Sequence, residues 1–224
     1  MSSFGNIYLC WRKGSGSKRH IVGIIKYQNG RGVSFQYLSK EKITEAISDG
    51  FTTYTEFSDL EKVYTENVLE VFKQRLFRSE RSDYKQFLDF WGIDEVHKED
   101  TLYILAYTQG LVPTDNFEFL ADFNLTKKLK FVSEIAGLTH TKAPSDILSI
   151  GDEIEWKICT TEHDKYQVNL YTKDHFSLGC VKKIHSKVFH DKRTQGPKII
   201  VKSIDKNGIL KRVFIEISQK EIKN

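Results

Sequence analysis

The second half of this chain is built on DEIEWKIC (residues 152–159), YQVNLYT (166–172) and FSLGCV (176–181). Each segment is rich in β-branched and aromatic residues and is separated from the next by a short polar stretch, which is the pattern of strands joined by loops. Three more segments of this kind surround them: LKFVSEIAG (129–137), GPKIIVKSID (196–205) and ILKRVFIEI (209–217). KKIHSKVF (182–189) predicts one short helix. Six short strands and one helix predict a small OB-like β-barrel.

The first half of the chain predicts a β-meander followed by helices. Three β-favouring segments are separated by turn-rich sequence: NIYLCW (6–11), HIVGIIKY (20–27) and GVSFQY (32–37). Asn29-Gly30 favours a turn between the last two. Helical periodicity follows in SKEKITEAIS (39–48), TENVLEVFKQRLF (65–77), DYKQFLDFWG (83–92) and KEDTLYILAYTQG (98–110). Thr65 is the expected N-cap of the second helix, and Gly92 is expected to end the third.

These patterns predict an α+β chain with two domains. A turn is expected at Pro113-Thr114-Asp115, and the pattern changes from helical to β shortly after it. We therefore place the boundary between 122 and 123. Domain 1–122 would be a β-meander with helices that serves in protein interaction, and domain 123–224 would be the OB-like barrel with one short helix.

The composition is that of a folded globular protein, with 39% hydrophobic, 12% aromatic and 29% charged residues. No run approaches the roughly 18 apolar residues of a membrane helix, and the N-terminus lacks the pattern of a signal peptide. Cys10, Cys159 and Cys180 form no C-x-x-C pair, so we expect buried small hydrophobes in a reducing compartment. A cytoplasmic protein without membrane contact is predicted.

Charge is divided unevenly between the two halves. Residues 1–124 carry 15 Lys and Arg against 18 Asp and Glu, which gives −3, whereas residues 125–224 carry 19 against 12, which gives +7. This asymmetry indicates that the second half meets a polyanion, and nucleic acid is the polyanion we expect. The alternative is a solubilising surface on which the lysines are unevenly placed.

The sequence offers little for catalysis. Its seven histidines are scattered, and neither H-E-x-x-H nor paired C-x-x-C is present to hold a metal ion. G-x-S-x-G and the glycine-rich, H-R-D and D-F-G elements of kinases are also absent. We therefore predict a protein that is not an enzyme and that uses no metal and no cofactor.

A series of short features follows a fixed order in the second half. In chain order they are Gly137-Leu138-Thr139-His140 after a strand, Gly151-Asp152 before the next, Tyr166 with Asn169, and Leu178-Gly179 followed by Val181-Lys182-Lys183. With residues 131–217 as its extent, this region resembles a HIRAN domain, the OB-like module of helicase-like transcription factors and of many bacterial proteins. The resemblance implies binding of single-stranded DNA or DNA ends.

One position departs from the family pattern. Where the family has an acidic segment, typically Asn-Pro-Tyr-Asp-x-Asn-Ala-Ile, this chain has Asp164-Lys165-Tyr166-Gln167-Val168-Asn169-Leu170, so that Gln167 replaces the aspartate. In family members that capture the 3′ end of single-stranded DNA, the aspartate helps to hold the terminal hydroxyl. Recognition of the end therefore stays open here, as does the choice between single-stranded DNA, duplex DNA and RNA.

The predicted nucleic-acid site combines a basic track for phosphates with aromatic faces for bases. Lys182, Lys183 and Lys187 would line one side of the short helix, with Lys192-Arg193 after it, and Tyr166 is the expected stacking face. We expect Tyr171 and Phe176 in the core. Thr139 and His140 would form the opposite wall of a pocket, unless they belong to a tight strand turn with a solvated histidine. The predicted site residues are Thr139, His140, Tyr166, Gln167, Asn169, Lys182, Lys183 and Lys187.

The first half carries a second resemblance, through IYLCWRKG, HIVGIIKY and VSFQYLSK. These segments, within 5–110, resemble the N-terminal subdomain of HipA-type toxin kinases and the separate small subunit HipS. The resemblance implies docking to a HipA/HipT-type kinase and a setting in bacterial stress, defence or toxin–antitoxin systems. An antitoxin subunit that neutralises such a kinase through its first domain is therefore the alternative function. A nuclease is a third hypothesis, although no carboxylate cluster points to it.

Overall fold

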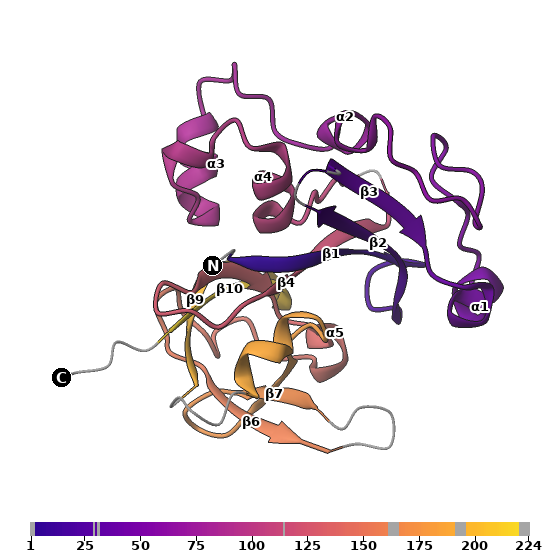
Figure 1. The fold of residues 1–224 in the computed structure, drawn as a ribbon. Coiled ribbons are helices and arrows are strands. Elements are labelled where there is room, and N and C mark those ends of the chain that lie inside the picture. Colours follow the sequence, from indigo (N-terminus) through magenta and orange to yellow (C-terminus); the bar gives the residue numbers. More distant parts are fainter. Residues whose placement is uncertain are drawn as a thin grey trace. The chain divides into compact units, whose positions relative to one another are not determined.

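The structure is a computed structural model that describes residues 3–28, 30, 32–113, 115–160, 166–190 and 196–219. The chain divides into two compact units, Phe4–Asp122 and a second formed by Met1–Ser3 with Phe123–Asn224. We call them the N-terminal unit and the C-terminal unit. Helices and antiparallel sheets both occur in the chain, which confirms the predicted α+β class (Figure 1).

The N-terminal unit contains one four-stranded sheet. Its strands are β1 (Phe4–Arg12), β2 (Arg19–Gln28), β3 (Gly32–Tyr37) and β4 (Phe117–Phe123), in the order β3-β2-β1-β4. β1 pairs with β2 and β2 with β3, both antiparallel, so the predicted meander is confirmed. The sequence did not indicate that β4 would add to β1. Asn29, the predicted turn residue, lies outside the described residues.

All four predicted helical segments contain a helix. They are α1 (Lys40–Ser48), α2 (Val68–Lys73), α3 (Tyr84–Trp91) and α4 (Thr101–Thr108), with a short 3-10 helix, η1 (Glu95–His97), before α4. α3 ends at Gly92 with φ 67°, as predicted. The expected cap at Thr65 is wrong, because Asn67 adopts a left-handed conformation with φ 55° and α2 begins only after it.

Aromatic packing holds α2 against the sheet. The Phe72 ring lies 5.5 Å from that of Phe35 on β3 and 4.8 Å from that of Phe119 on β4. Phe57 completes the cluster at 5.2 Å from Phe72. All four rings are buried, and each large ring removed from water contributes to the stability of this unit.

A buried arginine connects the end of α2 to the segment before β4. Arg75 Nε donates to the Gly110 carbonyl over 3.0 Å, and its guanidinium pairs with Asp115 and donates to the Phe117 carbonyl over 3.2 Å. Burial lowers the pKa of Arg75, but hydrogen bonds with Asp115 and Tyr54 outweigh it and raise the pKa above its ordinary value. The guanidinium therefore stays charged inside the unit.

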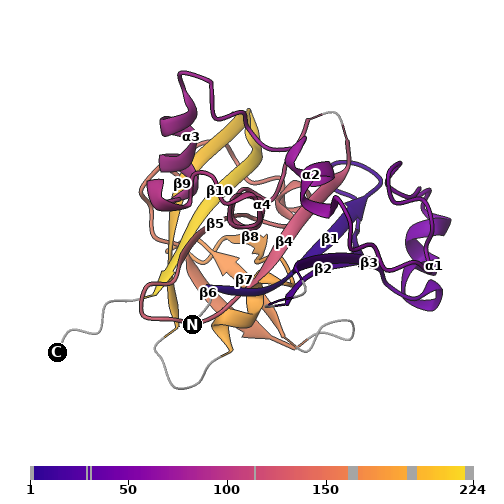
Figure 2. The same cartoon turned by 45° about the horizontal axis from the view of Figure 1, so that its top comes forward.

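The C-terminal unit contains all six predicted strands. They are β5 (Lys130–Glu134), β6 (Glu155–Cys159), β7 (Gln167–Tyr171), β8 (Ser177–Cys180), β9 (Pro197–Asn207) and β10 (Ile209–Gln219). They form two three-stranded sheets, β5-β10-β9 and β6-β7-β8, and Figure 2 shows β9 and β10 as the two strands of a long antiparallel hairpin. Within the described residues these two sheets do not close into a barrel, which corrects the predicted OB-like barrel.

The reason for the open arrangement lies where β6 meets β9. The Ile154 amide donates to the Ile199 carbonyl over 3.0 Å, but the Trp156 side chain then takes over, and its Nε1 donates to the Pro197 carbonyl over 3.0 Å. The Trp156 side chain thus takes the carbonyl that the next backbone hydrogen bond between β6 and β9 would use. Gly196 makes room, because a Cβ there would overlap the Trp156 ring. The Trp156 ring also packs against Phe189, 5.0 Å away.

Two short helices complete the C-terminal unit. The predicted helix is confirmed as a 3-10 helix, η2 (His185–Phe189). His185 anchors it: the side chain is fully buried beside the Phe131 ring, and its Nδ1 lies 2.8 Å from Ser133 Oγ. The Gly137 turn continues into one helical turn, α5 (Leu138–Thr141). None of the helices in the described part of the chain is long and apolar enough to cross a membrane.

Candidate nucleic-acid interface

The sheet β6-β7-β8 has one apolar face and one polar face. Along β7, Val168 and Leu170 are fully buried, whereas Gln167, Asn169 and Tyr171 are only half-buried, as the two-residue period of a strand requires. Directly paired residues share a face, so the pairing extends this polar side to the neighbouring strands. We call it the outer face, and its members are Glu155, Lys157, Cys159, Gln167, Asn169, Tyr171, Ser177 and Cys180.

The centre of the outer face is an amide pair. Gln167 Nε2 donates to Asn169 Oδ1 over 2.6 Å, so each amide fixes the orientation of the other. Lys157 is exposed and lies opposite Asn169 on β6. Amides and a lysine side by side can contact base edges and a phosphate, respectively.

The α5 turn joins this face at its β8 edge. Ala136 and Cys180 exchange two backbone hydrogen bonds of 2.8 Å, and Cys180 pairs with Asn169. Gly179, with φ 118°, permits this approach, because a Cβ there would overlap the Ala136 carbonyl oxygen. Thr139 and His140 are exposed on α5, just beyond Ala136. The structure therefore places these two predicted residues beside β8, the strand next to β7, which carries Gln167 and Asn169.

Tyr166 is the exposed aromatic of this region. Its side chain is 63% exposed, directly before β7, and its carbonyl lies 3.0 Å from His190 Nε2 at the end of η2. The two rings are 5.1 Å apart in an edge arrangement, so His190 supports the Tyr166 backbone and ring together. A tyrosine presented in this way leaves ring surface accessible for a base to stack on.

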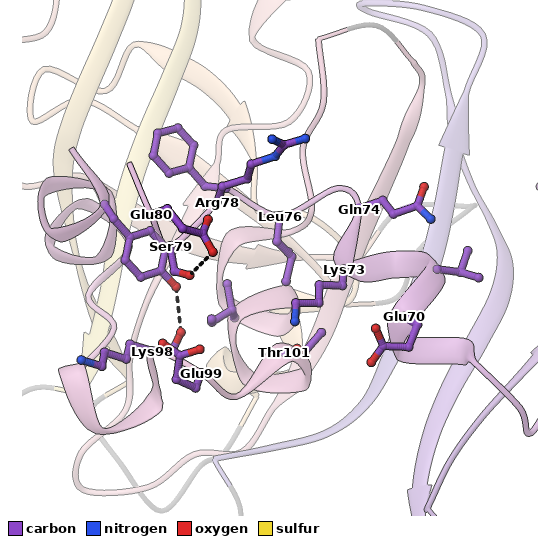
Figure 3. Close-up of a pocket in the computed structure, with 14 residues that line it drawn as sticks. Glu70, Lys73, Gln74, Leu76, Arg78, Ser79, Glu80, Lys98, Glu99 and Thr101 are labelled. Carbon is purple, nitrogen blue, oxygen red and sulfur yellow. Dashed lines mark hydrogen bonds between the residues drawn. The ribbon is translucent and has the colours of Figure 1, made fainter. Parts of the chain in front are cut away.

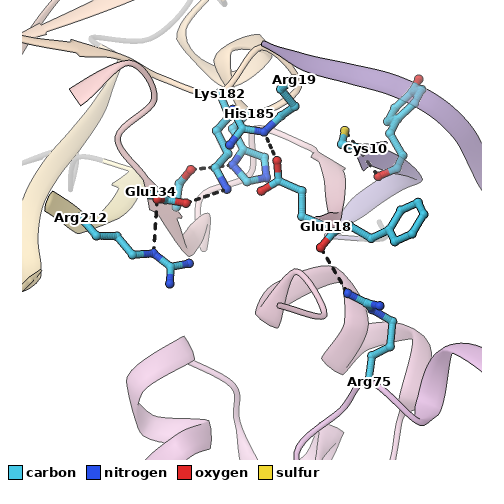
Figure 4. Close-up of polar contacts among 11 residues, drawn as sticks. Cys10, Arg19, Arg75, Glu118, Glu134, Lys182, His185 and Arg212 are labelled. Carbon is cyan, nitrogen blue, oxygen red and sulfur yellow. Dashed lines mark hydrogen bonds and ion pairs between the residues drawn. The ribbon is translucent and has the colours of Figure 1, made fainter. Parts of the chain in front are cut away.

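The three predicted lysines have different positions. Lys183 and Lys187 are exposed, before and within η2. The expectation that Lys182 lines the exposed side of the helix is wrong, because its side chain is 0% exposed and its Nζ lies 3.5 Å from Glu134 Oε2 (Figure 4). Glu134 Oε1 also lies 3.3 Å from Arg212 Nε. A buried ammonium needs such a partner, and we leave Lys182 out of the interface.

Two residues of the outer face, Lys157 and Tyr171, were not predicted correctly from the sequence. Lys157 was not singled out, although the alternation along DEIEWKIC could have placed it on the face opposite to the apolar side chains of Ile154 and Trp156. Tyr171 was expected in the core and is instead half-buried on the outer face, with Lys157 Nζ 5.8 Å from its ring centroid. Phe176 is also half-buried. Lys192 and Arg193 lie outside the described residues.

The N-terminal unit has its own hollow, of about 1020 Å³. Glu70 and Lys73 of α2 lie on one side and Lys98 and Glu99 on the other, with Leu76 and Thr101 between them (Figure 3). Three acidic residues, Glu70, Glu80 and Glu99, balance three basic ones, Lys73, Arg78 and Lys98. This balance does not favour a polyanion. Nothing in the hollow tests the predicted kinase partner, which stays a prediction.

No group of three or more histidine, cysteine or acidic side chains in the described residues could hold a metal ion. No family model and no curated protein matches the chain. Among solved structures, the crystal structure of the HIRAN domain of human HLTF is similar, with a TM-score of 0.32 and 13% sequence identity over 41% of this chain and 77% of that one.

Proposed function

We propose that the C-terminal unit binds single-stranded nucleic acid, as a HIRAN-like module, and catalyses no reaction on it. The observation that carries the proposal is the grouping of an exposed aromatic ring, Tyr166, an ordered amide pair, Gln167 with Asn169, and exposed lysines on adjoining elements. Single strands bind to such surfaces because bases stack on aromatic rings while phosphates meet lysines. The excess of basic residues in this half supports the same ligand.

The first test is fluorescence anisotropy with a labelled single strand that carries a free 3′-hydroxyl, beside a 3′-phosphate version and a duplex, at several salt concentrations. Salt-sensitive binding of both single strands, tighter than that of the duplex, is the expected result. A preference for the free hydroxyl would add end recognition despite Gln167. Absence of binding at low salt would overturn the proposal and direct attention to the N-terminal unit.

Two variants locate the site. Tyr166→Ala should weaken single-strand binding by about 1 to 3 kcal/mol, because it removes a stacking face, and should change duplex binding less. Lys183→Ala should weaken binding to all sequences and reduce the salt slope by about one unit. If both variants bind like the wild type, the site lies elsewhere.

The absence of catalysis is tested separately. Labelled DNA and RNA incubated with the protein and magnesium should keep their length on a denaturing gel. Shortened products that disappear with chelator would favour the nuclease hypothesis instead. The antitoxin alternative predicts that the chain suppresses phosphorylation by a HipA/HipT-type kinase, and Tyr166→Ala should not alter such an activity, since Tyr166 belongs to the other unit.

A further inference from the structure

The open junction between β6 and β9 leaves one apolar side chain of β6 exposed. Ile158 pairs with the fully buried Val168 on β7, so both residues belong to the apolar face of the sheet. Ile158 is nevertheless 47% exposed. The described contacts between β6 and β9 end at Trp156, two residues before Ile158. No strand in the described part of the chain therefore covers Ile158 from that side.

Tyr166 lies on the same side of the sheet as Ile158. The helix η2 packs on the apolar face through Phe189, whose ring lies 5.0 Å from that of Trp156. The next residue is His190, whose ring lies 5.1 Å from that of Tyr166 and whose Nε2 lies 3.0 Å from the Tyr166 carbonyl. The Tyr166 ring is therefore directed toward η2 and away from the outer face.

We infer that one unpaired base of the bound strand packs between the Tyr166 ring and Ile158, and that the backbone of the strand follows η2, where Lys187 meets a phosphate. Tyr166 precedes Val168 by two residues, so it is the diagonal neighbour of Ile158, at about 7 to 8 Å for regular strands. A base stacked on Tyr166 thus comes within reach of the Ile158 methyl groups. This inference rests on the proposed function and adds the side of the sheet on which the strand lies.

The helix η2 places a lysine next to this notch between Tyr166 and Ile158. The His190 amide donates to the Lys187 carbonyl over 3.2 Å, and residues three apart in a 3-10 helix lie above one another. At a rise of about 2 Å per residue, Lys187 and His190 are separated by roughly 6 Å along the helix. Lys187 is exposed, as is Lys183 one turn earlier. A backbone that runs along η2 therefore passes two ammonium groups on its way to the notch.

The chemistry of the notch fits an unpaired nucleobase. An aromatic ring offers its face for stacking, an apolar side chain contacts the edge of the base, and the lysines of η2 neutralise phosphates. A base inside a duplex is stacked on both sides and has to leave the stack before it can enter such a notch. An apolar side chain of a protein partner would fill the notch without using Lys187, and the experiment separates these two occupants.

The experiment uses two single strands of about 12 nucleotides, within the range of OB-type sites. One is an oligothymidylate, and the other has the same backbone with an abasic site at every position. Each is titrated by fluorescence anisotropy, at several salt concentrations, against wild type, Ile158→Thr and Lys187→Gln. The matched controls are Ile150→Thr, at a 70% exposed isoleucine in the loop before β6, and Lys128→Gln, at an exposed lysine before β5. Thermal unfolding checks that each variant folds.

We expect Ile158→Thr to weaken binding of the oligothymidylate about fourfold, because an apolar contact with the base is lost, and to leave the abasic strand unchanged. Ile158→Leu keeps an apolar side chain of the same volume and should bind within about twofold of wild type. Lys187→Gln should weaken binding of both strands and reduce the salt slope by about 0.7, the value for one phosphate of a single strand, while Lys128→Gln should not.

Three outcomes would overturn the inference. If Ile158→Thr binds like Ile150→Thr, or weakens binding of both strands equally, no base lies in the notch. If the salt slope falls in Lys157→Gln and not in Lys187→Gln, the strand lies on the outer face instead, and this comparison holds even if Ile158→Thr fails to fold. In these cases, weaker binding by Tyr166→Ala would leave the proposed function standing. If wild type binds neither strand at low salt, both are overturned.

Discussion

Arg75 in the N-terminal unit and Lys182 in the C-terminal unit are both buried cations, and they are held in different ways. Arg75 is surrounded by acceptors: the Asp115 carboxylate, the Tyr54 hydroxyl and two backbone carbonyls. Lys182 forms an ion pair with the Glu134 carboxylate, which also lies beside Arg212. The comparison teaches that a count of basic residues does not describe a basic surface, because one lysine of the motif lies inside while its neighbour Lys183 is exposed.

The largest effect is expected from removing the arginine. Arg75→Met removes the guanidinium from Asp115, which keeps a hydrogen bond from the Phe117 amide, and from the two backbone carbonyls. Breaking a buried ion pair of this kind costs about 3 to 5 kcal/mol. Denaturant unfolding followed by circular dichroism should show an earlier transition for the N-terminal unit. The control is Arg81→Met, which removes an exposed pair with Asp83 and should leave that transition in place. Equal effects of the two variants would contradict the structural role of Arg75.

The second prediction concerns the shared carboxylate. Glu134→Gln leaves the Lys182 ammonium buried without its counter-charge, and we expect a loss of about 3 kcal/mol in the C-terminal unit. Lys182→Met should cost less, about 1 kcal/mol, because Glu134 keeps Arg212 and a linear apolar chain replaces the buried lysine. Urea unfolding of the two variants measures the difference. A larger loss for Lys182→Met would show that the lysine, not the carboxylate, organises the cluster.

The third prediction addresses the glycine that lets α5 approach β8. Gly179→Ala places a Cβ against the Ala136 carbonyl at a positive φ, with an expected cost of about 1 to 3 kcal/mol. Gly137→Ala shares the positive φ but meets open space, so its cost should be lower. Hydrogen exchange of the Ala136 and Cys180 amides reports the local effect. Unchanged protection in Gly179→Ala would mean that the bridge is not what holds Thr139 and His140.

The smallest change in stability is expected at Lys183, and it tests the contrast between this exposed lysine and the buried Lys182 most directly. Lys183→Met changes an exposed side chain next to Lys182, so the free energy of unfolding should stay within about 0.5 kcal/mol of wild type. Thermal unfolding of Lys182→Met and Lys183→Met, measured side by side, tests whether the two adjacent lysines have separate roles. A stability loss in the Lys183 variant as large as in the Lys182 variant would refute the division.

Periodicity and turn residues were sufficient to predict the meander, the four helical segments, the six later strands and η2. They could not predict that the later strands form two open sheets. That outcome depends on a bond between the Trp156 side chain and the Pro197 carbonyl, which are distant in sequence. The start of α2 was misjudged for a local reason, the left-handed conformation of Asn67.

The candidate site was predictable to the extent that it depends on strand order. Gln167 and Asn169 share a face because they are two residues apart on β7, and any strand would place them so. Lys182 and Lys183 could not be told apart, since they are identical residues in adjacent positions and only the partner Glu134, on β5, distinguishes them. Lys157 and Tyr171 become neighbours through the register of β6 and β7, which no local pattern specifies.

Trp156 also gives the protein a built-in optical reporter. Of the three tryptophans, Trp11 and Trp91 belong to the N-terminal unit, so Trp156 is the only indole between residues 123 and 224. Its Nε1 donates a hydrogen bond to the Pro197 carbonyl, and its ring lies close to Gly196 and in edge contact with Phe189. In a variant with Trp11→Phe and Trp91→Phe, tryptophan fluorescence would come from Trp156 alone, where β6 meets β9. Its emission wavelength would then follow the opening of β6 from β9, one residue away from Lys157, without an attached dye.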